Sequence, residues 1–401
     1  MTVRLADLVD LSDQQRLVQE SIREICEGYD AGYWRERDRT GDYPTEFVDE
    51  LGEHGWFGIL VPEQYGGAGM GTPETVVMME EIAHAGGGFT ASQAVHGGIY
   101  NSVPLVRYGS EELKASVLPG VARGETAIQA FGLTEPNAGS NSTAIETVAE
   151  RDGDDYVVNG QKIWTSRVDE TDYLVLMART TPLSAVDKRT RGISMFLVDV
   201  DRAVDAGSLE LQPIPKSASR AVHAFELWFD DLRVPADHLV GEEGAGFSQV
   251  LDGLNEERLV IAAECLGLGE LAIDRAVDYA NEREVFGRVI GTNQAIQHPL
   301  ARAFSRLQAA KQLTYRAADA VDGASDTSMG ARANMAKYLA SEAAFEAADA
   351  AVQTHGGFGV ATEYDVERYF REARLTRLVP ITQELALNFI GERVLGLPKS
   401  Y

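Results

Sequence analysis

The middle of this chain contains the stretch Tyr156-Val157-Val158-Asn159-Gly160-Gln161-Lys162-Ile163-Trp164-Thr165, which decides its fold class. β-Branched and aromatic residues favour strands, and Asn-Gly between two such runs is a strong signal for a tight hairpin turn. We therefore predict two antiparallel strands that meet at Asn159-Gly160. Further strands are expected at residues 173–178 and 193–198, and the polar residues 181–191 between them are expected to form a mobile loop.

Helical patterns flank this β-region on both sides. On the N-terminal side, apolar residues recur with the 3.6-residue helical period at residues 46–51, at residues 75–85, and at Leu17, Val18, Ile22 and Ile25. On the C-terminal side, long helices are predicted at residues 257–281, 299–321 and 331–354. The sequence thus predicts an α+β protein of three domains, which are a helical domain (1–125), a β-domain (126–240) and a helical bundle (241–401).

The composition is that of a globular protein, with 44% hydrophobic and 24% charged residues among 401. No apolar run reaches the length of a bilayer, and the first seven residues turn acidic without the apolar stretch of a signal peptide. Two cysteines, Cys26 and Cys265, are too few for a disulfide framework. We expect a soluble, cytoplasmic protein.

The charge balance excludes several classes of partner. Thirty-six basic residues against sixty-two acidic ones leave a net charge of −26, which repels nucleic acid and anionic membranes. Only seven of the basic residues are Lys, which suits either a halophile or a GC-rich genome. The seven His and two Cys show no His-x-x-x-His or Cys-x-x-Cys spacing, so we expect no metal site.

A dinucleotide-binding βαβ unit is also disfavoured, because no strand runs into Gly-x-Gly-x-x-Gly and then a helix. The run Gly356-Gly357-Phe358-Gly359 follows a predicted helix instead. It fits a helix C-cap, and it fits a turn whose bare N–H groups bind a pyrophosphate. The sequence leaves both interpretations open.

Four motifs resemble signatures of the acyl-CoA dehydrogenase family, in that family's order and spacing across almost the whole chain. The first is Phe131-Gly132-Leu133-Thr134-Glu135-Pro136-Asn137-Ala138-Gly139-Ser140-Asn141. The others are Gly160-Gln161-Lys162-Ile163-Trp164-Thr165-Ser166, then Glu282-Arg283-Glu284-Val285-Phe286-Gly287 with Gln294-Ala295-Ile296-Gln297, and finally Gln353-Thr354-His355-Gly356-Gly357-Phe358-Gly359. The resemblance implies that family's fold, with a β-barrel-like central domain and a C-terminal four-helix bundle.

The resemblance also implies FAD, bound between the β-domain and the bundle. The Thr134 hydroxyl is expected near flavin N5, where a hydrogen bond would stabilise charge arriving on the ring, and Trp164 is expected to shield one ring face. The alternative for Thr134 is that it is an ordinary strand residue, and the alternative for Trp164 is that it is a core aromatic. The full set of matched cofactor positions in this subunit is Phe131, Leu133, Thr134, Gly139, Ser140, Trp164, Ser166, Thr382 and Glu384.

A second set of positions matches family residues that reach the FAD of a neighbouring subunit. Arg283 suits a pyrophosphate because its guanidinium is a planar fork of donors, and neither Tyr279 nor Gly287 at i±4 offers it a carboxylate. A shared cofactor site implies at least a dimer, and the family suggests a homotetramer. The set comprises Arg283, Phe286, Gln294, Gln353 and Gly357.

The implied reaction is oxidation of an acyl-CoA thioester to the trans-2-enoyl-CoA, which needs a carboxylate to remove the α-proton. Many family members carry this Glu in a C-terminal loop, where this chain has Pro380, which has no proton chemistry. Isovaleryl-CoA and long-chain members carry it on the helix after the β-domain, followed by Arg. Glu257 and Arg258 match those positions. An apolar acyl pocket would raise the pKa of such a base by desolvation.

Glu257 also has a purely structural interpretation, in which Asn255 is a helix N-cap and the following carboxylates complement the helix dipole. Glu256 competes as the base but should point about 100° away around the helix. Glu384 is a weaker candidate. By family match, Ser140 and Arg258 lie near the substrate, whereas Ser92, Gln93 and His96 either line the acyl-tail pocket or serve only helix packing.

Three functional readings remain. The first is an acyl-CoA dehydrogenase that passes electrons to an electron-transfer flavoprotein. The second is a flavin oxidase or monooxygenase on the same fold, and the third is a non-catalytic FAD-binding relative. Asn141 and Val222 depart from the residues usual in the family, although both lie beside the redox centre rather than within it.

Overall fold

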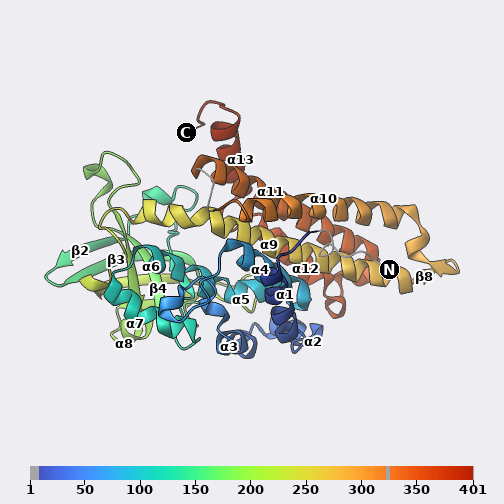
Figure 1. Ribbon diagram of the computed structural model, residues 1–401, viewed down its shortest axis with the longest axis horizontal. Coiled ribbons are helices and arrows are strands. Elements are labelled where there is room, and N and C mark those ends of the chain that lie inside the picture. The colour runs from blue at the N-terminus through green and yellow to red at the C-terminus, as the bar shows by residue number, and fades with distance from the viewer. Residues whose placement is uncertain (1–8, 322–325, 401) are drawn as a thin grey trace.

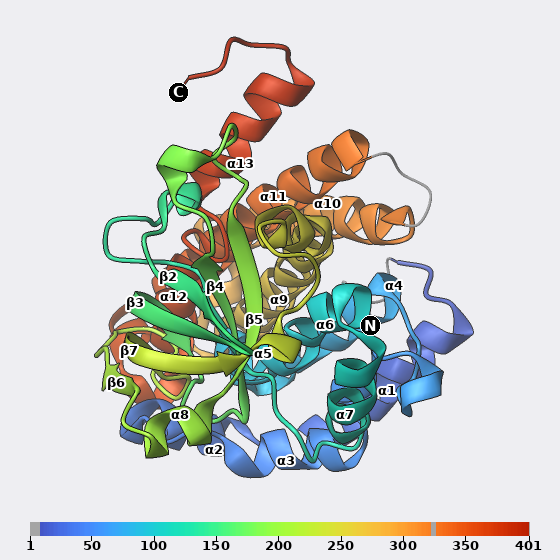
Figure 2. The ribbon, with the colours of Figure 1, turned by 90° about the vertical axis from the view of Figure 1, so that its left-hand side faces the viewer.

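The computed structural model describes residues 9–321 and 326–400, so the first seven residues considered above lie outside it. Helices at the N-terminal end and a long helical bundle enclose one side of a curled sheet (Figure 1). Seen along the long axis, the sheet lies beside the end of the bundle, and the N-terminal helices run below and to the right of it (Figure 2). Within the described ranges, no helix has both the length and the apolarity to cross a bilayer.

The N-terminal helices form where the 3.6-residue pattern predicts them. A capping box at Ser12 starts the first helix, whose Val18, Ile22 and Ile25 are buried. Leu17 is 61% exposed, so its assignment to the same face was wrong, because adjacent residues are about 100° apart. The helices are α1 (Asp13–Cys26), α2 (Ala31–Thr40), α3 (Thr45–Glu53), α4 (Thr72–Ile82), α5 (Gly88–Tyr100), α6 (Ser102–Tyr108) and α7 (Glu111–Ala122).

The central sheet has seven strands in the order β1-β4-β2-β3-β7-β6, with β5 paired to the outer side of β4. All pairs are antiparallel except those that β4 makes with β1 and β2. A short helix, α8 (Val200–Asp205), follows the fifth strand. The strands are β1 (Ala130–Gly132), β2 (Val148–Asp152), β3 (Asp155–Ser166), β4 (Tyr173–Arg179), β5 (Ile193–Asp199), β6 (Leu209–Pro213) and β7 (Ala224–Pro235).

The predicted hairpin at Asn159-Gly160 is wrong, because β3 passes through both residues without turning. Its register against β7 shifts between Val158 and Gly160, which marks a bulge. Gly160 has φ +149°, and a Cβ there would lie 2.6 Å from the Thr147 side chain, so close packing requires glycine. Asn159 bonds to Asp231 on β7. The true hairpin turn lies at Gly153, between β2 and β3.

The C-terminal bundle is built on α9 (Gly246–Glu282), a helix of 37 residues that runs from the sheet to the opposite end of the molecule (Figure 1). It starts eleven residues before the predicted start at residue 257. α10 and α11 pack against it, and α4 and α5 cover another face. The remaining elements are β8 (Glu284–Val285), β9 (Arg288–Val289), α10 (Gln294–Ala318), α11 (Asp326–His355), α12 (Val366–Thr376) and α13 (Gln383–Phe389).

A buried ion pair on α12 fixes the sharp bend between α4 and α5. Arg368 donates to the carbonyls of Gly86 and Gly87 at 3.1 and 2.8 Å, and Glu372 accepts the Phe89 N–H at 2.8 Å. The two side chains also contact each other at 3.2 Å. Together they satisfy backbone groups that the bend leaves without helical partners. This clamp sets where α5 begins, and therefore which α5 side chains face α9.

Candidate active site

Glu257 and His96 face each other where α5 crosses α9. His96 Nε2 lies 3.5 Å from Glu257 Oε1, and its Nδ1 lies 2.6 Å from Glu264 Oε1. The seven-residue spacing of the two carboxylates is close to two helical turns, so both share the face of α9 that meets α5. Glu264 is completely buried, whereas the Glu257 side chain is 20% exposed. The partly open carboxylate is thus the one that a ligand could reach.

The structure separates Glu257 from its neighbour Glu256. Arg107 on α6 donates to both Glu256 oxygens, at 2.6 and 2.7 Å, on a different side of α9. Because α9 begins at Gly246, Asn255 lies well inside the helix, and the interpretation of Asn255 as an N-cap was wrong. Asn255 Oδ1 instead accepts from Arg258 Nη1 at 2.7 Å. Glu257 therefore has no role in capping the helix.

Arg258 follows Glu257 and is partly buried. Burial lowers the pKa of its guanidinium, and the charge of Glu257 opposes that effect. Among the described residues, its Nε is buried without a hydrogen-bond partner. A buried, unsatisfied donor is costly, so this atom is a candidate contact for a ligand. Ser140, the other expected substrate neighbour, is exposed on the loop after β1.

The loop after β1 is anchored to β3 by a buried lysine. Lys162 Nζ donates to the Leu133 carbonyl at 3.1 Å and to Glu135 Oε1 at 2.7 Å. Burial lowers the pKa of Lys162 to about 8, and the Glu135 carboxylate limits that fall. The Ile163 N–H also donates to the Thr134 carbonyl at 2.9 Å. These bonds hold Leu133 and Thr134 at one edge of the sheet. Phe131, Leu133 and Thr134 are all half-buried there.

Trp164 breaks the inward packing of β3. It has φ +63°, beside a register shift between Lys162 and Thr165, and its side chain is 56% exposed. The interpretation of Trp164 as a core aromatic is therefore wrong. A left-handed, exposed tryptophan presents an indole face that a planar ligand could cover. Ser166, two residues on, is half-buried.

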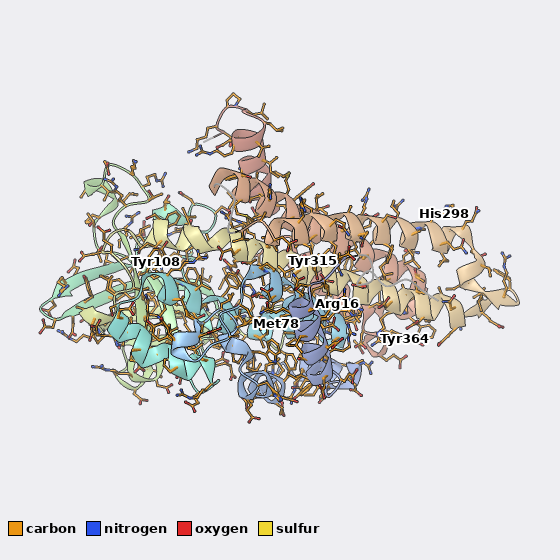
Figure 3. All side chains as sticks on the ribbon, viewed as in Figure 1. Arg16, Met78, Tyr108, His298, Tyr315 and Tyr364 are labelled. Atoms are coloured by element: carbon orange, nitrogen blue, oxygen red, sulfur yellow. The ribbon has the colours of Figure 1, made fainter. Side chains whose placement is uncertain are left out.

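The second set of expected cofactor residues lies at the opposite end of the molecule. Arg283 and a fully exposed Phe286 belong to the β8–β9 hairpin, which projects beyond α9 and α10 (Figure 1). Gln294 opens α10, and Gln353 lies near the end of α11. Figure 3 places His298 of α10 and Tyr364, whose ring packs on His355 at the end of α11 and on Phe358, toward this hairpin end. The cofactor positions on the sheet and this second set thus lie toward opposite ends of α9, whose 37 residues span about 55 Å.

The Gly356-Gly357 turn directly follows α11. Gly356 has φ +59°, which is the left-handed C-cap conformation, so that interpretation is confirmed. A Cβ at Gly357 would meet nothing within 4 Å, so packing within the protomer does not require glycine there. The turn is exposed and leaves room for a close approach from outside.

The segment around Pro380 connects α12 to α13. Lys337 donates to the Ile381 carbonyl at 2.8 Å, and the Thr382 hydroxyl accepts the Leu385 N–H as the N-cap of α13. Glu384 is exposed in the first turn of α13, where its own backbone N–H lowers the pKa of its carboxyl. Thr382 and Glu384 thus lie together at the start of α13, which packs on α11.

The comparisons with known proteins follow the same three-part layout. The N-terminal, middle and C-terminal domain models of the acyl-CoA dehydrogenase family match residues 12–125, 130–232 and 244–395. The chain belongs to the acyl-CoA dehydrogenase family. It is therefore an oxidoreductase built on the three-domain flavoenzyme fold of that family, with a helical, a curled-sheet and a second helical part.

Individual relatives cover nearly the whole chain. The acyl-CoA dehydrogenase FadE12 of Mycobacterium tuberculosis is 37% identical over 393 residues, which are 97% of this chain and 98% of that protein. The structure of glutaryl-CoA dehydrogenase with glutaryl-CoA has a TM-score of 0.89 and 32% identity, with 98% of each chain covered. The FAD complex of PigA (TM-score 0.89, 97% and 99% covered) and the prolyl acyl carrier protein oxidase AnaB (0.86, 97% and 100%) are both 26% identical.

The residues of the chain fit a flavin. The exposed indole of Trp164 offers an aromatic face, and the open space at Gly139 and Gly357 leaves the backbone approachable at both sets of residues. Arg283 adds an exposed guanidinium suited to a pyrophosphate.

Several residues of the site could not be assigned from the sequence motifs. Glu264 and Lys162 are buried charges whose partners come from other elements. For His96, the sequence left two roles open, lining of the acyl-tail pocket and helix packing. Ser92, considered with His96, bonds to its own helix at the Phe89 carbonyl and serves packing. One signal was available, because Glu264 is the only charged residue between Leu259 and Leu266. A lone carboxylate in an apolar helical run indicates a buried partner.

Proposed function

We propose that this protein is an FAD-dependent dehydrogenase that converts an acyl-CoA thioester to the trans-2-enoyl-CoA, with Glu257 as the catalytic base. The observation that carries the proposal is the position of Glu257. It lies in the interior of α9, has no capping role and keeps part of its carboxylate exposed. Arg258 beside it has a buried donor that the described residues leave unsatisfied.

The chain supplies the acid–base part of the reaction. Bound FAD would accept the hydride that leaves the β-carbon. Glu257 takes the α-proton, and the electron pair of that C–H bond becomes the new α,β double bond. The loop held by Lys162 would place Thr134 beside the ring, and Trp164 would cover the ring face away from the thioester.

The direct test is an anaerobic titration of the purified holoenzyme with butyryl-, isovaleryl- and palmitoyl-CoA, followed by flavin absorbance. We expect one class of thioester to bleach the flavin stoichiometrically. A short branched or a long acyl chain is expected from the helix location of the base. A holoenzyme that none of the thioesters bleaches would be a non-catalytic relative, or one that acts on another substrate.

A flavin oxidase is the second candidate, favoured by the likeness of the chain to the oxidase AnaB over 97% of its length. The two functions differ in the electron acceptor. A dehydrogenase reduced by its thioester should reoxidise slowly in air-saturated buffer and rapidly with an electron-transfer flavoprotein. Rapid reoxidation by O₂ with release of hydrogen peroxide would favour the oxidase.

The two separated sets of cofactor residues support a shared FAD site in a homo-oligomer, which we propose to be a tetramer. Because Arg283 would bind the FAD of a neighbouring subunit, Arg283→Ala is expected to weaken FAD retention about tenfold, the loss of about 1.4 kcal/mol. FAD release into dilute buffer, followed by fluorescence, measures it. Arg288→Ala is the matched control, because Arg288 in the same hairpin bonds to Asn293 of its own chain. Equal FAD loss in both variants would contradict a specific role for Arg283.

A further inference from the structure

His96 lies at the centre of a buried charge cluster beside the proposed base. We propose that His96 is a positioning residue, whose imidazolium donates Nδ1–H to Glu264 and Nε2–H to Glu257, and so aims the Glu257 carboxylate. The inference rests on the proposed function, in which Glu257 removes the α-proton. His96 itself would not touch the substrate.

The first support is the way the ring is held. Glu264 is fully buried and uses both oxygens, because Oε1 contacts His96 Nδ1 at 2.6 Å and Oε2 accepts from Gln93 Nε2 at 2.9 Å. The Tyr100 ring stacks on the imidazole with 5.7 Å between centroids and 13° between planes. The bond at one ring nitrogen and the stacking together orient the other nitrogen. Nε2 is therefore directed at Glu257 by its surroundings and not by Glu257 alone.

The second support is the charge balance of the cluster. Arg167 is buried between the sheet and α5, where its Nη1 donates to the Gln93 carbonyl at 2.6 Å, and its charge interacts with both Glu257 and Glu264. On the Glu257 side, the charge of Arg258 also interacts with that carboxylate. Among the described residues, Glu264 has Gln93 and His96 as hydrogen-bond partners and only His96 as an ion-pair partner. Because a buried carboxylate without a cation in contact is costly, the protonated form of His96 is favoured beside Glu264. Tyr43 and Tyr100, also close by, are neutral as phenols at physiological pH.

The protonation equilibrium of His96 agrees with this balance. Burial disfavours the imidazolium, but Glu264 and Glu257 outweigh it and raise the pKa of His96 to about 9. At neutral pH both ring nitrogens therefore carry a proton and both donate. The 3.5 Å separation from Glu257 Oε1 is that of a weak hydrogen bond, of the kind that commonly tightens when substrate binds.

The positioning role predicts a specific pH dependence. As pH rises through about 9, His96 loses its proton and the positive charge beside Glu257 disappears. Flavin reduction in the wild type is then expected to fall along an alkaline limb centred near that pH. His96→Gln should remove this limb and lower the rate of flavin reduction about 10²-fold at pH 7.5, with KM little changed. Glu264→Gln should move the limb about one unit lower, because the imidazolium loses its main counter-charge.

His84→Gln is the matched control. His84 also pairs with a carboxylate, Asp274, at 2.9 Å, but Asp274 lies seventeen residues beyond Glu257 on α9, about 25 Å along the helix. The control should keep the rate and the alkaline limb of the wild type. Stopped-flow flavin reduction between pH 6 and 10, with the thioester that bleaches the wild type best, gives the profiles.

A second measurement does not depend on turnover. NMR titration of ¹³C-labelled histidine in the holoenzyme, with His96 assigned by its absence in His96→Gln, should show a midpoint near 9. A His96 that is neutral at pH 7.5, or a His96→Gln enzyme with an intact alkaline limb, would overturn the inference. If none of the tested thioesters reduces the wild type yet His96 titrates near 9, the proposed acyl-CoA dehydrogenase reaction with these thioesters fails and the positioning role falls with it, while the charge arrangement around His96 stands.

Discussion

Replacing Glu257 with Gln is expected to slow flavin reduction by acyl-CoA about 10³-fold or more, while acyl-CoA still binds. Gln keeps the size of the side chain and can still meet His96, but it cannot take the α-proton. General-base catalysis contributes about 10²- to 10⁴-fold, and here the described residues near His96 offer no second exposed carboxylate at the same place. Stopped-flow bleaching gives the rate, and the shift of the flavin spectrum under anaerobic conditions gives the binding.

Glu256→Gln is the control for this prediction, because it removes the adjacent carboxylate. Glu256 is held by Arg107 on a different side of α9, so its loss should leave the bleaching rate within a few-fold of the wild type. The opposite pattern, a slow Glu256→Gln and a fast Glu257→Gln, would assign the base to Glu256. If both variants react like the wild type, Glu384 becomes the candidate to replace next.

The order of helical and β-regions could be predicted because helix and strand periodicities are local properties of the sequence. α10 and α11 each begin five residues before their predicted starts at residues 299 and 331. α1 contains all four apolar residues whose spacing predicted a helix there. The start of α9 was placed eleven residues late, because Gly246 and Gly253 weaken the helical pattern before Glu257. That error alone created the N-cap interpretation of Asn255.

The hairpin at Asn159-Gly160 failed for a different reason. The Asn-Gly signal describes what a short peptide prefers, whereas here the glycine is required by the approach of Thr147 and the asparagine by its bonds to Asp231. Both partners are distant in the sequence, so tertiary packing overrides the turn signal. A bulge within a strand and a turn between strands both favour glycine, and the sequence alone does not separate them.

In the candidate site too, contacts between residues distant in the sequence could not be predicted. Glu257 could be proposed from a motif because its own neighbours in the sequence carry the pattern. His96 and Glu264 are 168 residues apart, and only the crossing of α5 over α9 brings them together. The start of α5 is held in turn by the Arg368–Glu372 clamp, whose residues lie more than 100 positions from His96 and Glu264 in the sequence. Cross-element pairs of this kind require the folded structure.

Replacing Lys162 with Met is expected to destabilise the folded protein by about 3 kcal/mol at pH 7 and to speed FAD loss. Met keeps the length of the buried side chain but leaves Glu135 without its counter-charge, and breaking one partner of a buried pair costs about 3–5 kcal/mol. The lower end applies because Glu135 still accepts the Glu146 and Thr147 N–H groups at 2.6 and 3.0 Å. Urea denaturation of the holoenzyme measures the stability.

The effect on FAD follows from the second bond of the same lysine. Without Lys162, the Leu133 carbonyl loses its donor, and of the two bonds that tie Leu133 and Thr134 to β3 only the one from the Ile163 N–H to the Thr134 carbonyl remains. The control is Arg233→Met in the same sheet, where water screens the exposed pairs with Asp152 and Asp155, so the stability should stay close to that of the wild type. Lys162→Met/Glu135→Gln should recover much of the stability but not the FAD retention, because the charge imbalance is removed while Leu133 stays unbonded. Recovery of both would show that the lysine acts on the cofactor only through the charge of Glu135.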